Sequence, residues 1–271
     1  MSGIISPSGK RVLDSLLYMY VRKDGSDTND GSANDSAHAF LTIGKAIEVY
    51  ESLDCNGYDV RIDVADGTYI EQIFISNRLG AGNLFIFGNI SNPGNVIVDG
   101  DVNNSLWVKG HRLGSYVQID GFKLTTDPFG GNGILAEDGA EVRIGRINFG
   151  DVGYSHVQAY SGAKVLFLYP YEISGDADNH IEADVGAIIQ NYINGNVTLS
   201  GSPVTFGTAF ALCYTTGVIE IYSPTVNFVI TGVAGQRYLC EQNSIINTFG
   251  GGAAYLPGSV AGSIATQGQY L

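Results

Sequence analysis

An eleven-residue pattern that recurs five times constrains the fold of this 271-residue chain more than any other feature. The first copy reads ILAEDGAEVRI from Ile134, and later copies begin at Val157, Ile181, Ala211 and Tyr238. The third position of every copy is small, and these positions are 23, 24, 30 and 27 residues apart. Repeats of this length are typical of solenoids, in which each repeat forms one turn.

Each copy alternates apolar and polar residues with a period of two, and a turn-forming pair such as Gly139-Ala140 interrupts it. One turn of short strands cannot bury its own inner face, whereas stacked turns can. Parallel strands about 4.8 Å apart would stack equivalent residues into ladders, so a small residue is expected where the interior is crowded. The predicted inward small ladder is Ala136, Ala159, Ala183, Cys213 and Cys240. The pattern therefore predicts an all-β parallel β-helix of roughly eight turns.

The two ends of the chain differ from the repeats. Residues 40–53, FLTIGKAIEVYESL, place apolar residues three and four apart, which predicts an amphipathic helix that caps the first turn. We expect residues 1–58 to form an attachment segment and helix cap, 59–249 the β-helix, and 250–271 an irregular Gly/Ala-rich tail. In the first segment, an apolar stripe is a candidate attachment surface or packs on the helix cap instead. The stripe is Val12, Leu13, Leu16 and Leu17.

Charge and cysteine content exclude several functions. Fourteen Lys and Arg against 27 Asp and Glu give a net charge of −13, which repels nucleic acid. No apolar run of about 18 residues exists, so membrane insertion is not expected. Three cysteines provide no disulfide framework, and their spacing predicts no zinc site. We expect Cys213 and Cys240 to be buried free thiols and Cys55 to be exposed.

The segment YVRKDGSDTNDGSANDSAHAFLTIGKAIEVY, followed by VRIDVADGTYIEQIFIS, resembles the N-terminal cap of pectin-lyase-like right-handed β-helix proteins. The ending AYLPGSVAGSIATQGQYL is similar to the tails of β-helix proteins from bacteriophages and prophages. The resemblance implies a single-stranded right-handed parallel β-helix. The family that the chain resembles includes polysaccharide lyases and hydrolases, tail spikes and non-catalytic virion proteins, so the choice among functions depends on the site residues.

The outward column beside the small ladder is the candidate site. It reads Glu137, Tyr160, Asp184, Tyr214 and Glu241. Tyrosines stack on sugar rings, so the glycan-binding candidates are Tyr160, Asp184, Tyr214 and Glu241. Glu137 and Asp184, two turns apart, are the candidate catalytic carboxylates, since the pair could span the distance between the carboxylates of an inverting glycosidase. We expect no basic residue in this column, and a solvated face or a subunit contact is the alternative interpretation.

No cofactor or metal is expected. The acidic loop DGSDTNDGSAND departs from EF-hand spacing and lacks the closing Glu, so its Asp and Asn residues are interpreted as turn formers. The histidines are His38, His111, His156 and His180. His156 and His180 occupy matching positions before their repeats and are interpreted as structural.

These observations favour a non-enzymatic structural component of a bacteriophage virion, a tail spike, tail fibre or capsid decoration. We expect a homotrimer that contacts other virion proteins through residues 1–58 or the tail and binds host surface polysaccharide. Because the N-terminus lacks a signal peptide, synthesis in the host bacterial cytoplasm before assembly into the virion is expected. The alternative is a polysaccharide-degrading lyase or hydrolase that uses the acid–tyrosine face. A bacterial surface adhesin is a third hypothesis, which the N-terminus disfavours.

Overall fold

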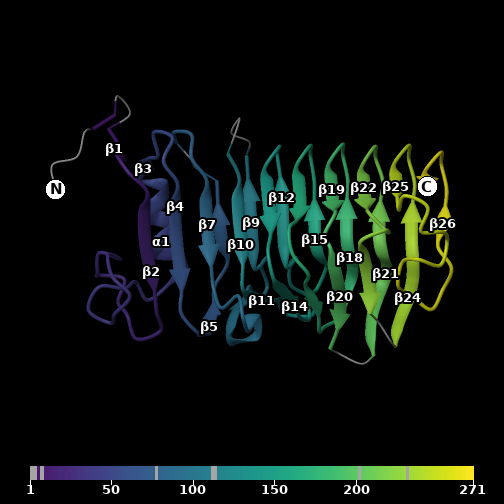
Figure 1. The fold of residues 1–271 in the computed structure, drawn as a ribbon, viewed down its shortest axis with the longest axis horizontal. Coiled ribbons are helices and arrows are strands. Elements are labelled where there is room, and N and C mark those ends of the chain that lie inside the picture. Colours follow the sequence, from purple (N-terminus) through teal and green to yellow (C-terminus); the bar gives the residue numbers. More distant parts are fainter. Residues whose placement is uncertain (1–4, 7–8, 77–78, 111–114, 201–202, 230–231) are drawn as a thin grey trace.

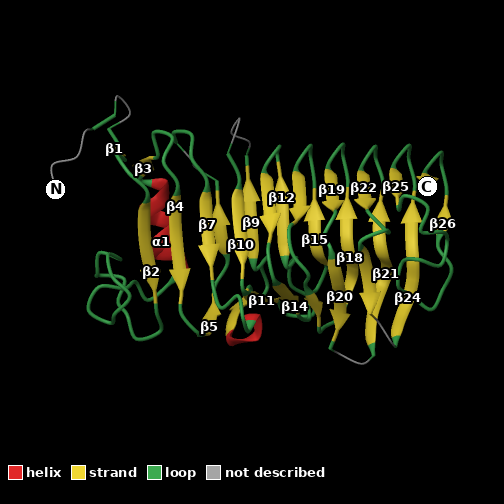
Figure 2. Cartoon of the chain, in the orientation of Figure 1, coloured by secondary structure: helices red, strands yellow, loops and turns green. Residues whose placement is uncertain are grey.

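The chain winds into a parallel β-solenoid, with β1 (Arg11–Val12) and β26 (Ser263–Ile264) at opposite ends of the long axis (Figure 1). The computed structural model describes residues 5–6, 9–76, 79–110, 115–200, 203–229 and 232–271. Strands dominate these residues, and one α-helix accompanies them near the N-terminal end (Figure 2). The predicted all-β parallel β-solenoid is thereby confirmed.

Three parallel sheets run the length of the solenoid, and we number them by chain order. Sheet 1 contains β2 (Leu17–Val21), β4 (Val60–Val64), β7 (Leu84–Phe87), β10 (Val117–Asp120), β13 (Glu141–Ile144), β16 (Lys164–Phe167), β19 (Ile188–Asn191), β22 (Val218–Ile221), β25 (Ile245–Asn247) and β27 (Gln269–Tyr270). Sheet 2 contains β5 (Gly67–Ile70), β8 (Val96–Asp99), β11 (Phe122–Thr125), β14 (Ile147–Phe149), β17 (Glu172–Ile173), β20 (Gly195–Leu199) and β23 (Val226–Val229). Sheet 3 contains β6 (Ile73–Ile75), β9 (Leu106–Lys109), β12 (Ile134–Glu137), β15 (Ser155–Ala159), β18 (Ala177–Ala183), β21 (Val204–Cys213), β24 (Val233–Cys240) and β26 (Ser263–Ile264). Outside them, β1 (Arg11–Val12) pairs with β3 (Leu53–Asp54), and η1 (Pro93–Asn95) precedes β8.

A complete turn consists of one strand from each sheet. Sheet 2 has seven strands in the described residues, so about seven turns are complete, one fewer than the sequence predicts. The difference arises because three turns are longer than the assumed length of about 24 residues: the partners Leu84 and Val117 are 33 residues apart, Ile188 and Val218 are 30 apart, and Val218 and Ile245 are 27 apart. Strands β18 and β21 shift register between Ala177 and Asn179, and β21 is ten residues long.

The five small residues of the repeat lie on adjacent strands of sheet 3. Ala136 pairs with Ala159, Ala159 with Ala183, and Cys213 pairs with both Ala183 and Cys240. All five side chains are fully buried. Since equivalent residues stack at the strand spacing, a larger side chain at one level would press on the levels above and below.

A tight turn repeats where sheet 3 leads into sheet 1. In the first of these turns, Ala140 N–H donates to the Glu137 carbonyl, and Asp138 and Gly139 both have positive φ, 55° and 76°. These are the features of a type I′ β-turn. The same pair of left-handed residues recurs at Ser161-Gly162, Val185-Gly186, Thr215-Thr216, Gln242-Asn243 and Thr266-Gln267. The pairs identified from the sequence, such as Gly139-Ala140, therefore begin one residue after the first of the two left-handed residues of each turn, here Asp138 and Gly139.

The helix α1 (Ile43–Glu51) lies at the N-terminal end, beside β2 and β4 (Figure 1). Its buried residues are Ile43, Ala46, Ile47 and Tyr50, which join the hydrophobic core. Thr42 is the N-cap, and the Glu71 carboxylate accepts hydrogen bonds from the Ile43 and Gly44 amides at 3.1 and 2.7 Å. A carboxylate at this position accepts hydrogen bonds from amides that lack an intrahelical partner, and its charge interacts favourably with the positive end of the helix dipole. In the described residues, no helix is long and apolar enough to span a membrane.

The sheets extend past both boundaries predicted for the β-helix. Strand β2 pairs with β4, so sheet 1 begins before residue 59. Within the tail expected to be irregular, β26 pairs with β24 and β27 pairs with β25. In the N-terminal stripe, Leu13 is buried in the core, Leu17 packs partly against it, and Leu16 is exposed. Leu13 and Leu17 of the stripe therefore pack against the protein's own core.

Candidate functional site

The structure brings the predicted acid–tyrosine column together, because each member is the first residue of a type I′ turn. Their backbone amides continue the parallel ladder: Tyr160 N–H donates to the Ala136 carbonyl, and Asp184 N–H donates to the Ala159 carbonyl. Tyr214 and Glu241 continue the series on the next two strands. The side chains of this column differ in exposure and in their contacts.

Glu137 pairs with a lysine that the sequence comparison missed. Lys109 lies directly opposite it on β9, and the Lys109 Nζ–Glu137 Oε1 distance is 2.9 Å. The carboxylate raises the pKa of Lys109. The expectation that no basic residue shares this column is therefore wrong, because the column extends one turn before the first recognised repeat.

Asp184 is a turn residue rather than an accessible acid. Its side chain is 5% exposed, and its Oδ1 accepts a hydrogen bond from the Val185 amide at 2.6 Å. Val185 has a positive φ of 48°, which β-branched residues rarely adopt, and this hydrogen bond stabilises its left-handed backbone conformation. Tyr160, by contrast, is 39% exposed, and Glu241 is partly exposed. Glu137 and Asp184 therefore do not form an open pair of carboxylates.

All three cysteines are buried, and no disulfide joins any two of them. Burial raises the pKa of the Cys213 thiol to about 12. The prediction of an exposed Cys55 is wrong, since its side chain is 1% exposed. Its amide donates to the Leu79 carbonyl, and Gly82 lies against its Cβ, so residues 79–82 cover the thiol.

The acidic side chains of the loop at residues 24–35 contact neighbouring groups of the N-terminal region. Asp24 pairs with Arg22, Asp27 accepts hydrogen bonds from the Leu41 and Thr42 amides before α1, and Asp35 contacts His38. Across the described part of the chain, no three His, Cys, Asp or Glu side chains are grouped to hold a metal ion. His111 lies outside the described residues.

A buried carboxylate that the sequence did not single out lies on the outer side of sheet 3. Glu182, on β18, is 7% exposed, and four side chains donate hydrogen bonds to it. The donors are Ser155 Oγ at 2.6 Å, Gln158 Nε2 at 2.8 Å, Tyr214 Oη at 3.0 Å and Asn179 Nδ2 at 3.4 Å. Together they occupy about four acceptor positions, the full capacity of a carboxylate. Hydrogen bonds of this kind compensate the cost of burying its charge.

The network continues along the solenoid axis through side-chain amides. Asn132 Nδ2 donates to Asn104 Oδ1 and to Gln158 Oε1, at 3.1 Å in both cases. Asn132 Oδ1 in turn accepts from the Ser155 amide at 2.9 Å. At the other end, burial and the charge of Glu182 raise the pKa of Tyr214. The amides are therefore held in fixed orientations across several turns.

A surface cavity of about 310 Å³ opens over this network. Its floor contains Asn132, Gln158, Asn179 and Glu182, and its rim contains Tyr154 and Asp178. The Tyr154 side chain is 58% exposed, and Asp178 is also exposed. No lysine or arginine is among the described residues that line it. The cavity thus combines fixed amide groups, an accessible carboxylate and an aromatic ring, which suits a neutral ligand rich in hydroxyl groups.

The chemistry of this cavity favours binding over nucleophilic catalysis. Ser155 is fully buried and its hydroxyl donates to Glu182, so it is closed to a substrate. The carboxylate of Glu182 is already saturated with donors. Among the described lining residues, the groups left for a ligand are Tyr154 and Asp178 on the rim and the second N–H of the Gln158 amide.

A signal for Glu182 exists in the repeats, one position before the small ladder. This position reads Leu135, Gln158, Glu182, Leu212 and Leu239. Two adjacent turns place polar residues where the others place leucine. The predicted column lies at the position after the ladder, two residues beyond the position of Glu182 in each repeat.

No family model matches the sequence, and no curated protein matches it. Among solved structures, the chain is similar to pectin methylesterase from Aspergillus niger in its deglycosylated form, with a TM-score of 0.50 and 14% identity. This match covers 100% of the chain and 87% of the enzyme. The same enzyme with an N-acetylglucosamine stub matches with a TM-score of 0.50 and 15% identity, over 99% of the chain and 87% of the enzyme. The likeness shows a pectin-lyase-like parallel β-helix fold.

Proposed function

We propose that the protein binds a polysaccharide along the outer face of sheet 3, with one sugar seated in the cavity beside Glu182. The observation that carries this proposal is the set of four donors that fixes the Glu182 carboxylate and, through it, the amide of Gln158. Fixed polar groups bind hydroxyls with little further loss of side-chain entropy.

The rim of the cavity supplies the remaining elements of sugar recognition. The exposed ring of Tyr154 offers a face against which a sugar can stack, and the Asp178 carboxylate can accept hydrogen bonds from hydroxyls. Tyr160 is exposed directly after β15, two residues beyond Gln158, and it extends the aromatic surface past the end of that strand. An extended glycan fits this arrangement better than an isolated monosaccharide.

Affinity electrophoresis through gels that contain neutral or acidic polysaccharides tests this proposal. The wild-type protein should be retarded by at least one neutral polysaccharide. Tyr154→Ala should weaken that binding about three- to tenfold, the range expected for loss of one aromatic contact. Tyr58→Ala, which removes an exposed tyrosine elsewhere, should leave it unchanged. Equal retardation of wild type and Tyr154→Ala, or none by any polysaccharide, would contradict the proposal.

Polysaccharide cleavage or ester hydrolysis at the same face is the second candidate. It is favoured by the likeness to pectin methylesterase, which supports a carbohydrate-active protein better than a virion component. Assays of reducing-end and methanol release from pectin distinguish catalysis from binding. If activity is present, Asp178→Asn should lower it strongly, whereas Glu137→Gln, at the ion pair with Lys109, should not.

The homotrimer, the contacts with virion proteins and the virion location remain predictions from the sequence. Size-exclusion chromatography coupled to light scattering tests the homotrimer, because a trimer has three times the 28.8 kDa mass of one chain. A mass of one chain would contradict the trimer.

A further inference from the structure

An arginine ends a column of interior side chains. On β15, β18 and β21 the equivalent inward positions are His156, His180 and Phe210, as the flanking pairs of the register show. On β24 the same position is Arg237, since Ala209 pairs with Gln236 and Ala211 with Tyr238. The first three residues are fully buried, and their rings contact one another. Arg237 therefore occupies the position at which the preceding three turns have an aromatic or imidazole ring.

The guanidinium of Arg237 is incompletely satisfied. Its buried Nε has no hydrogen-bond partner among the described residues, and Nη1 makes a long contact of 3.4 Å with the Val260 carbonyl. Among the described residues, no carboxylate forms an ion pair with it, although the chain carries 27 acids. A buried N–H without a partner is unfavourable, and the positive charge of this partly exposed guanidinium has no counter-charge among the described residues.

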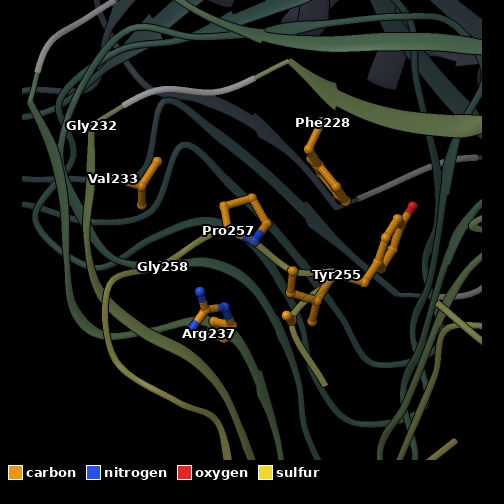
Figure 3. Close-up of a pocket in the computed structure, with 9 residues that line it drawn as sticks. Phe228, Gly232, Val233, Arg237, Tyr255, Pro257 and Gly258 are labelled. Atoms are coloured by element: carbon orange, nitrogen blue, oxygen red, sulfur yellow. The ribbon is translucent and has the colours of Figure 1, made fainter. Parts of the chain in front are cut away.

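A cavity of about 330 Å³ adjoins this side chain at the C-terminal end of the solenoid. Figure 3 shows the guanidinium directed toward Val233 and Pro257, with Phe228 and Tyr255 on the opposite side. The Tyr255 hydroxyl donates to the Val226 carbonyl at 2.7 Å and is not available to Arg237. The described lining residues include no acid. The charge in this cavity is therefore positive in a protein whose net charge is negative.

We propose that this cavity binds a carboxylate through Arg237. The two Nη groups of a guanidinium match the two oxygens of a carboxylate in a bidentate contact, and Nη1 of Arg237 is the group on the exposed side. Two sources can supply this group, a small free carboxylic acid or the acid group of a sugar. The proposal does not depend on the site at Glu182, which lies on other turns and has no cation among its described lining residues.

Nuclear magnetic resonance of the arginine Nε–Hε groups tests the proposal directly. The Arg237 signal is assigned by its loss in Arg237→Lys. Sodium acetate and sodium glucuronate serve as probes, with glucose and sodium chloride at matched ionic strength as controls. A saturable shift of this signal with both acids supports a site that needs the carboxylate alone. A shift with glucuronate alone supports a site for an acidic sugar.

Binding measured by calorimetry on variants completes the test. Arg237→Gln should weaken carboxylate binding about tenfold or more, as expected for loss of a charged hydrogen bond. Arg143→Gln, which removes an arginine already stacked on Tyr116 and paired with Glu141, should bind normally. Absence of a saturable shift with either acid, or equal binding by wild type and Arg237→Gln, would overturn the proposal. Circular dichroism confirms that each variant retains its strand content.

Discussion

The Nδ1 atoms of His156 and His180 lie 3.1 Å apart inside the solenoid, on adjacent strands of sheet 3. His156 Nε2 contacts the Gly150 carbonyl at 2.9 Å, and the Tyr171 hydroxyl contacts His180 Nε2 at 2.9 Å. Burial lowers the pKa of His156 to about 4, and burial together with the neighbouring imidazole lowers the pKa of His180. Both rings are therefore neutral at pH 7, so a single Nδ1 proton can join them.

This pair predicts a loss of stability in mild acid. The unfolded histidines bind protons near pH 6.5, whereas folded His156 does so near pH 4, so unfolding takes up protons between these values. The stability that His156 contributes is complete above pH 6.5 and lost as the pH falls toward 4. From pH 7 to pH 5 the loss is about 2 kcal/mol for His156 alone. Urea unfolding at both pH values measures it.

The double variant His156→Leu/His180→Phe provides the control. It removes both buried imidazoles and should reduce the pH dependence of the unfolding free energy by at least that amount. His38→Gln, at an exposed imidazole beside Asp35, should leave most of the dependence in place. The same pH dependence in wild type and double variant would show that the pair does not cause it.

The type I′ turns predict a cost for side chains at their glycines. At Gly162, with φ of 71°, a Cβ would meet no atom within 4 Å, so Gly162→Ala tests backbone conformation alone. We expect it to lower the free energy of unfolding by about 1 kcal/mol. Gly94→Ala, also in open space but without a positive φ, should be neutral or slightly stabilising. Equal effects of both substitutions in chemical denaturation would contradict the account of the turns.

The small ladder predicts intolerance of larger side chains. Ala159 is fully buried and pairs with Ala136 on one side and Ala183 on the other. Ala159→Ile should therefore lower the free energy of unfolding by about 1–3 kcal/mol, the usual range for overpacking. Ala253→Ile, at an exposed position, should change it by less than about 0.5 kcal/mol. A neutral Ala159→Ile would mean that the interior beside the ladder is less crowded than its burial indicates.

The parts of the fold that depend on local patterns were predictable from the sequence. The small ladder, the turns and α1 each depend on residues within one or two turns, whose periodicity is visible. The strands of the tail were missed because β26 and β27 are two residues long and carry little β-forming pattern. They form because the preceding turn presents an open strand edge.

The candidate site could not be located because it depends on contacts between turns. Glu182 receives donors from β15 and β21 as well as its own strand, and the sequence does not indicate which side chains turn toward it. Lys109 was missed because its turn lacks the recognisable repeat. Cys55 was placed at the surface because its covering residues, 79–82, follow 24 residues later in the chain.

The most direct test of the account is a crystal structure with an oligosaccharide from the polysaccharide that binds best. We predict a sugar in the cavity over Glu182, stacked on Tyr154 and hydrogen-bonded to Gln158 or Asp178. An oligosaccharide bound elsewhere, with this cavity occupied by water alone, would contradict glycan binding at this cavity.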